Sequence, residues 1–257
     1  MRKKIIAGNW KMHGNRAEVR TLITELKQGV TAFPKIEMIV FPSFVFLSEV
    51  QALLQNSAIF LGAQNIYPAK SGAFTGEIST EMLVETGCKY VLVGHSERRS
   101  ILREPLDFIA KKFKAVLQAG MCPVLCVGET QEEREKNMTE KVIDHQLQTV
   151  MDFCGLDAFR EVIIAYEPVW AIGTGLTATP EQAQQVHQFI RTLFAKQDVE
   201  LAQNLSLLYG GSVKADNAAS LFAMPDVDGA LVGGASLIAK DFLAIAKAAE
   251  QVSSVLC

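Results

Sequence analysis

A carboxylate, an imidazole and an amine each follow an apolar run in this 257-residue sequence. Glu167 stands near the end of EVIIAYEP, His95 follows YVLVG, and Lys11 follows KIIAGNW. A carboxylate can remove a proton next to a carbonyl group if hydrogen-bond donors face the oxygens that gain charge. A neutral histidine can donate to one such oxygen, and a lysine supplies fixed positive charge for an oxyanion or a phosphate. The three residue types together are therefore suited to acid–base chemistry on a charged substrate.

Each of these residues taken alone also has a purely structural explanation. A lysine at a strand end is usually just solvated, His95 could be a hydrogen-bonded histidine at the edge of a sheet, and a glutamate before proline is ordinarily a turn residue. His13, His145 and His187 do not stand beside other polar residues at the ends of the apolar runs. We expect the last two on helix surfaces. Only convergence on one edge of the fold would give the first three residues a common function.

Eight short apolar runs are suited to bring these side chains together. Each is rich in Val, Ile, Leu or aromatic residues and ends in Gly, Asn, Ser, His or Glu; the runs are 4–10, 37–43, 59–65, 90–96, 122–129, 161–168, 205–212 and 229–236. Between them lie amphipathic segments with helical spacing, among them 16–30, 140–153, 180–194 and 239–252. Thr179 before Pro180 is typical of a helix start. Continuous apolar strands that alternate with helices predict a parallel sheet.

The length allows either two ordinary domains or one large α/β barrel. The even spacing, with no linker and no charged run, favours a single (β/α)8 barrel over residues 1–257 rather than an open doubly wound sheet. Chemistry in such a barrel sits at the carboxyl ends of the strands, where the candidate residues fall. Segment 65–79 is the exception to the even pattern, because it is long and has little helical character.

The composition argues against several classes of binding partner. The chain is 49% hydrophobic and 21% charged with a net charge of −3, which argues against nucleic acid or an anionic membrane as the main partner. No apolar run approaches a membrane span, and the one at the start is too short for a signal sequence. The five cysteines include no CxxC pair, and Cys122 and Cys126 on one strand would be roughly 13 Å apart. These features predict a reduced, cytoplasmic protein.

The glycines favour phosphate binding over dinucleotide binding. GTGLTA (173–178) fits GxGxxA, and Asp198 follows at a suitable distance. The first glycine of that fingerprint must directly follow a strand, however, and residues 167–172 intervene. Gly210-Gly211-Ser212 and Gly233-Gly234 leave backbone N–H groups unobstructed, and the loops after strands 7 and 8 are the usual phosphate site of such barrels. The alternative is that these glycines merely permit tight turns.

Five motifs carry a resemblance to a known family: GNWKM (8–12), GHSERR (94–99), AYEPVWAIGTG (165–175), YGGSV (209–213) and LVGGASL (231–237). In this order, from the first strand to the last, they resemble the triosephosphate isomerases. The resemblance implies interconversion of dihydroxyacetone phosphate and D-glyceraldehyde 3-phosphate through an enediolate, without a metal or an organic cofactor. It also implies a place in glycolysis, gluconeogenesis and the pentose phosphate pathway.

The resemblance further implies residue roles. Glu167 would be the base, His95 the neutral electrophile, Asn9 and Lys11 part of the substrate site, and Glu97 a carboxylate that supports Lys11. The phosphate would bind Gly173, Ser212, Gly233 and Gly234. A closing lid would comprise Pro168, Val169, Trp170, Ala171, Ile172, Gly173, Thr174, Gly175, Leu176 and Thr177, with Ala171 and Ile172 at an exposed apolar tip. Segment 65–79 would dock onto a second subunit of a homodimer, with Thr75 near the neighbour's active site.

Some observations leave other interpretations open. His13, Leu176 and Ile238 stand where the family often has Asn, Lys and Lys, and Leu176 bears on lid opening. A different phosphate-binding barrel enzyme, a sugar-phosphate isomerase or epimerase, would use two Asp residues on opposite strands, and none is found at the predicted strand ends. A catalytically inactive barrel that binds a phosphorylated metabolite would have no use for a base at Glu167.

Overall fold

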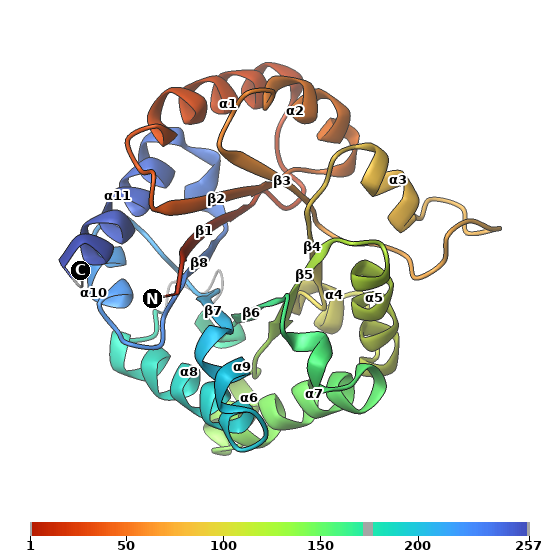
Figure 1. Cartoon of the computed structure of the whole chain (residues 1–257), viewed down its shortest axis with the longest axis vertical. Coiled ribbons are helices and arrows are strands. Elements are labelled where there is room, and N and C mark those ends of the chain that lie inside the picture. Colours follow the sequence, from red (N-terminus) through yellow and green to blue (C-terminus); the bar gives the residue numbers. More distant parts are fainter. Residues whose placement is uncertain (1, 172–176, 256–257) are drawn as a thin grey trace.

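Eight parallel strands form a closed barrel in sequence order, with β1 hydrogen-bonded to both β2 and β8 (Figure 1). The computed structural model describes residues 2–171 and 177–255, with side chains as far as residue 252. The strands are β1 Lys4–Asn9, β2 Ile36–Phe41, β3 Ile59–Ala63, β4 Tyr90–Val93, β5 Cys122–Val127, β6 Ile163–Tyr166, β7 Ser206–Tyr209 and β8 Gly229–Val232. The predicted (β/α)8 barrel is therefore confirmed.

Helices surround the strands as an outer ring (Figure 1). They are α1 Arg16–Val30, α2 Leu47–Leu53, α3 Thr80–Glu85, α4 Ser96–Ser100, α5 Leu106–Gln118, α6 Gln131–Glu135, α7 Thr139–Cys154, α8 Pro180–Ala195, α9 Val199–Asn204, α10 Ala218–Phe222 and α11 Ala239–Val255, with 3-10 turns η1 Phe44–Phe46, η2 Leu156–Phe159, η3 Val169–Ala171 and η4 Gly234–Leu237. Thr179 caps α8 as predicted: its side chain accepts the N–H of Gln182, and Pro180 opens the helix. None of the helices in the described part of the chain is long and apolar enough to cross a membrane.

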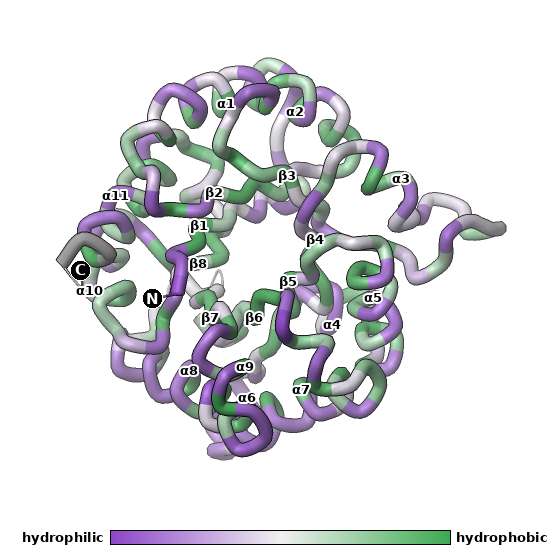
Figure 2. Tube along the Cα trace, in the orientation of Figure 1, coloured by the Kyte–Doolittle hydropathy of each residue, from purple (hydrophilic) through white to green (hydrophobic). Residues whose placement is uncertain are grey.

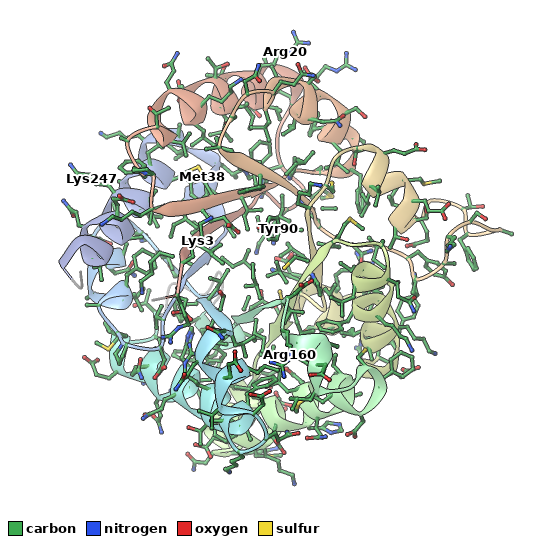
Figure 3. The ribbon with its side chains drawn as sticks, viewed as in Figure 1. Lys3, Arg20, Met38, Tyr90, Arg160 and Lys247 are labelled. Carbon is green, nitrogen blue, oxygen red and sulfur yellow. The ribbon has the colours of Figure 1, made fainter. Side chains whose placement is uncertain are left out.

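Alternating strand residues divide the apolar interior into two cores. Ile5 and Ala7 of β1 point into the barrel, whereas Ile6 between them packs against the helices. Figure 2 shows the strands at the centre as largely hydrophobic, and Figure 3 shows Tyr90 toward the middle of the ring with Arg20 and Lys247 at its outer edge. The barrel interior is thus filled with side chains, which leaves the rim as the place for a ligand.

His187 on α8 is completely buried, so its expected place on the helix surface was wrong. Its Nδ1 lies 3.1 Å from the carbonyl oxygen of Asp226, and since a carbonyl only accepts, Nδ1 carries the proton. Burial lowers the pKa of His187 to about 4. Its neighbours Val186 and Ile190 are buried too, so helical spacing alone would have placed His187 on the inner face. His145, in contrast, is exposed as expected.

Segment 65–79 projects from the barrel beside α3 as an irregular loop (Figure 1). Its base is held by Asn65, whose Oδ1 accepts a 2.7 Å hydrogen bond from the buried amine of Lys112. The ring of Tyr67 packs on Phe74 of the same loop and on Phe108 of α5, with centroids 4.2 and 5.6 Å apart. The loop therefore has a defined shape although it lacks regular secondary structure.

Candidate active site

A cavity of about 400 Å³ lies at the carboxyl ends of the strands. It is lined by nearly all the residues that the sequence singled out, namely Asn9, Lys11, His95, Glu97, Glu167, Ser212, Gly233 and Gly234. Of the predicted site and lid residues, Ile172, Gly173, Thr174, Gly175 and Leu176 lie outside the described residues. Within the described residues, no group of three or more His, Cys, Asp or Glu is placed to hold a metal ion.

Glu167 directly follows β6, and only 1% of its surface is exposed. Its Oε1 lies 2.9 Å from Nε2 of His95, and its Oε2 accepts the backbone N–H of Ser96 at 2.8 Å. Two glycines make room for it. A Cβ at Gly128 would lie 1.8 Å from the backbone oxygen of Glu167, and one at Gly210 would lie 2.9 Å from its Cγ. Larger residues at these positions would therefore displace the carboxylate.

The surroundings keep Glu167 ionised. Burial alone would raise the pKa of this carboxyl, but the charge and hydrogen bond of His95 and the N–H of Ser96 outweigh burial, so the pKa is lowered. A buried carboxylate at the wall of a cavity can leave such donors to accept a proton from a bound molecule.

His95 caps the N-terminus of α4, and its bonding pattern is that of a neutral ring. Nδ1 accepts the backbone N–H of Glu97 at 3.3 Å, so the proton is on Nε2, which faces Glu167. Burial lowers the pKa of His95, while the charges of Glu167 and Glu97 more than offset that effect, so the pKa is raised in this arrangement. A second proton, on Nδ1, would point at the N–H of Glu97. We therefore assign the neutral form, with Nε2–H as the donor.

Lys11 adopts a left-handed backbone conformation, with φ of 52°. Such a conformation costs a residue with a side chain about 1–3 kcal/mol and persists only where neighbours hold it. The side chain of Asn9 accepts the N–H of Lys11 at 3.0 Å, and the carbonyl of Lys11 accepts 2.8 Å hydrogen bonds from Ser43 and Gln64. Sequence analysis missed Ser43 and Gln64, and no motif marked them.

The strained backbone directs the Lys11 side chain across the cavity. Its amine lies 2.6 Å from Oε1 of Glu97, the carboxylate that the resemblance placed near it. A Cβ on Gly233 would lie 3.7 Å from Cε of Lys11, so the loop after β8 runs beside the lysine. Lys11 thus connects the α4 side of the cavity with its glycine-rich side.

The glycine-rich side contains Ser212 after β7 and Gly233 and Gly234 after β8. A Cβ at Gly234 would meet no atom within 4 Å, so packing does not require a glycine there, and the space faces the cavity. The expectation of a free N–H at Gly210 was wrong, because this N–H donates to the carbonyl of Tyr166 at 2.7 Å.

The described ends of the predicted lid are Pro168 to Ala171 and Thr177. Trp170 in η3 donates from Nε1 to Oε1 of Glu129 at 2.9 Å, and this oxygen also lies 3.1 Å from both Tyr166 Oη and Arg134 Nη1. Sequence analysis missed Glu129, although it ends its apolar run as Glu167 does. Ala171, expected at an exposed tip, is fully buried and lines the cavity.

Comparisons with known proteins show the family of this chain. The family model described as triosephosphate isomerase matches residues 4–249. The chain is 52% identical over 249 residues to the triosephosphate isomerase of Dechloromonas aromatica, covering 97% of this chain and 100% of that protein. It is 54% identical over 254 residues to the one from Pseudomonas putida, covering 97% and 99%. A match across nearly the whole chain at this identity leaves one assignment: the protein belongs to the triosephosphate isomerase family.

Proposed function

We propose that this chain interconverts dihydroxyacetone phosphate and D-glyceraldehyde 3-phosphate, with Glu167 as the base. The observation that carries the proposal is the buried, ionised carboxylate of Glu167 beside the Nε2–H of His95, in one cavity with the amine of Lys11. A base that faces two donors is what proton transfer between adjacent oxygen-bearing carbons requires. A protein that only binds a phosphorylated metabolite would not need this base.

The reaction begins when substrate enters the cavity. The carboxylate of Glu167 then leaves the backbone N–H of Ser96 and approaches the carbon-bound proton of the substrate. Glu167 removes this proton, and the electron pair of the broken C–H bond forms the enediolate. His95 donates from Nε2 to one substrate oxygen, and Lys11 stabilises the negative charge, with Glu97 holding its amine and Asn9 its backbone. The proton of the substrate hydroxyl passes through Nε2 of His95 to the former carbonyl oxygen. Glu167 then returns the abstracted proton to the neighbouring carbon, which leaves the enzyme unchanged.

The phosphate binds, in this proposal, at Ser212, Gly233, Gly234 and Gly173. The free space at Gly234 supports this placement, since a side chain there would project into the cavity. Backbone N–H groups of glycine-rich turns are good donors for phosphate oxygens. With the phosphate on this side, the reacting carbons would lie toward Glu167 and His95.

Residues 168–177 act as the lid in this proposal. Triosephosphate isomerase is itself a standard example of loop closure that excludes water from a reacting site. The hydrogen bond from Trp170 to Glu129 gives the first hinge a fixed anchor on the barrel. Ala171 already lines the cavity wall, which places the start of the proposed lid beside a bound substrate.

The chain functions as a homodimer in this proposal, with segment 65–79 docked on a second copy and Thr75 near that copy's active site. Exposed apolar side chains support this, because four neighbouring strands are followed by such residues: Met12, Val45, Phe74, Met82, Ile101 and Leu102. These residues follow β1 to β4, which are consecutive around the barrel, and a second subunit on that part of the molecule would remove their side chains from water.

The proposed setting is the cytoplasm, and the proposed pathways are glycolysis, gluconeogenesis and the pentose phosphate pathway. The substrate is a small phosphorylated triose, and we propose neither a nucleic acid nor a membrane as a partner. The net charge of −3 supports the absence of these partners, because nucleic acids and anionic membranes are both negatively charged and would repel the protein.

Isomerisation in D2O tests the proposed chemistry. An enediolate formed by Glu167 exchanges its proton with solvent, so dihydroxyacetone phosphate made from glyceraldehyde 3-phosphate should carry deuterium at the carbon that receives the proton. Mass spectrometry or proton NMR would detect it. Fast conversion without any deuterium in the product, together with undiminished conversion by Glu167→Gln, would indicate a direct hydride shift and would contradict the proposal.

A further inference from the structure

The charged residues that line the cavity must attract an anionic substrate to a protein that is itself negatively charged. Its charged lining residues are Lys11, Glu97, Glu167 and Lys214. Lys11 is paired with Glu97, and Glu167 is held in its ionised form. Without Lys214 the lining would therefore carry one positive and two negative charges, on a protein with a net charge of −3. A phosphate ester carries a charge of about −1.5 to −2 at pH 7, so it would be repelled.

Lys214 is the cation that corrects this balance. It lies two residues after Ser212 and lines the same cavity, and its side chain is exposed. Its amine has no hydrogen bond or ion pair with any residue in the described ranges 2–171 and 177–252, whereas the amine of Lys11 is paired. An unpaired amine at the edge of the cavity is free to meet an incoming anion.

Asn217 fixes the backbone that carries Lys214. Its Oδ1 accepts the N–H of Lys214 at 2.8 Å, and its amide nitrogen donates to the carbonyl of Ser212 at 3.1 Å. The N–H of Ala218 closes the turn on the carbonyl of Lys214 at 3.0 Å. The backbone of Lys214 is thereby held at a constant offset from Ser212, while its long side chain is exposed.

We propose that Lys214 recruits the substrate by attracting its phosphate to the cavity and guiding it toward Ser212, Gly233 and Gly234. The inference rests on the proposed function, because it needs the phosphate on this side of the site. A lysine is suited to this role, since it acts as a flexible point charge that needs no fixed geometry. Its contribution falls on the association step rather than on proton transfer.

Steady-state kinetics of Lys214→Gln and Lys214→Arg test the inference. At low ionic strength the Gln variant should lose about three- to tenfold in kcat/KM for glyceraldehyde 3-phosphate, with kcat within about twofold of wild type. Salt should shrink the difference to less than about twofold near 0.5 M, because the Debye length is then only a few ångströms. The Arg variant should keep most of the wild-type value, and turnover of glyceraldehyde, which lacks the phosphate, should not change.

Lys240→Gln is the matched control, since Lys240 is also exposed and near the barrel rim but does not line the cavity. An equal kcat/KM for wild type and Lys214→Gln at low salt would overturn the inference. So would an equal loss in Lys240→Gln, or an equal loss with glyceraldehyde. Failure of the proposed function would look different, because the wild type itself would then not isomerise glyceraldehyde 3-phosphate.

Discussion

At the scale of single residues, the buried His187 makes the free energy of unfolding depend on pH. His187 is neutral in the folded protein, with a pKa of about 4 against an ordinary value near 6.5. Between these two pH values the unfolded chain binds a proton that the folded chain does not, so the free energy of unfolding falls as the pH drops. The difference of about 2.5 between the pKa values corresponds to about 3 kcal/mol in total.

We predict that His187 lowers the free energy of unfolding by about 2 kcal/mol between pH 7 and pH 5. Urea unfolding of the wild type and of His187→Gln, at one fixed protein concentration, would show it as a steeper pH dependence of the wild type. The amide of Gln can still donate to the carbonyl of Asp226. The raised pKa of His95 acts in the opposite sense, because its stabilising effect is present at low pH and lost as the pH rises, but it is common to both proteins. Parallel pH profiles would show that burial of His187 does not cause the effect.

Among the elements of the fold, the turn after β8 is a place where a substitution should change substrate binding without changing stability. Gly234 opens η4, and a methyl group there would meet no atom of the described chain. We predict that Gly234→Ala keeps the thermal midpoint of the wild type but raises KM about tenfold or more, because the methyl group would occupy the proposed phosphate space. Circular dichroism melting and steady-state kinetics measure the two quantities.

Gly128→Ala is the contrasting variant. Its methyl group would collide with the backbone of Glu167, so this variant should lose stability as well as activity, by more than the about 1–3 kcal/mol of ordinary overpacking. An unchanged KM in Gly234→Ala would place the phosphate elsewhere, and an undisturbed melting point in Gly128→Ala would contradict the close approach of the backbones.

The strands and their polar ends could be predicted from the sequence, whereas contacts between separate loops could not. The periodicity of apolar residues located all eight strands, because a parallel barrel buries both faces of each strand and leaves continuous apolar runs. Polar residues at the ends of those runs pointed to the cavity, because the carboxyl ends of parallel strands meet at one rim. Ser43, Gln64 and Glu129 were not found, because their roles depend on distances between separate loops. The burial of Ala171 could not be predicted from the sequence either, because it follows from how η3 packs on the barrel.

For the whole molecule, we predict that activity depends on association of two copies. Thr75 is exposed in the projecting loop, so Thr75→Arg should fold normally but fail to dock. We expect sedimentation equilibrium to show a monomer, with specific activity reduced about tenfold or more, because Lys11 and His95 would lose support from the partner. Thr192→Arg, exposed on α8 on another side of the barrel, should remain an active dimer (Figure 1). A wild type that is monomeric and fully active would refute the prediction.

The most direct test of the proposed mechanism is the isomerisation rate of Glu167→Gln beside that of the wild type, under identical conditions. Gln keeps the shape of Glu167 and can still accept the N–H of Ser96, so the variant should fold, but its amide cannot take up the substrate proton. We predict a loss in kcat of about 10²- to 10⁴-fold or more, the range typical of a removed general base. A variant that turns over within a few-fold of the wild type would mean that Glu167 is not the base.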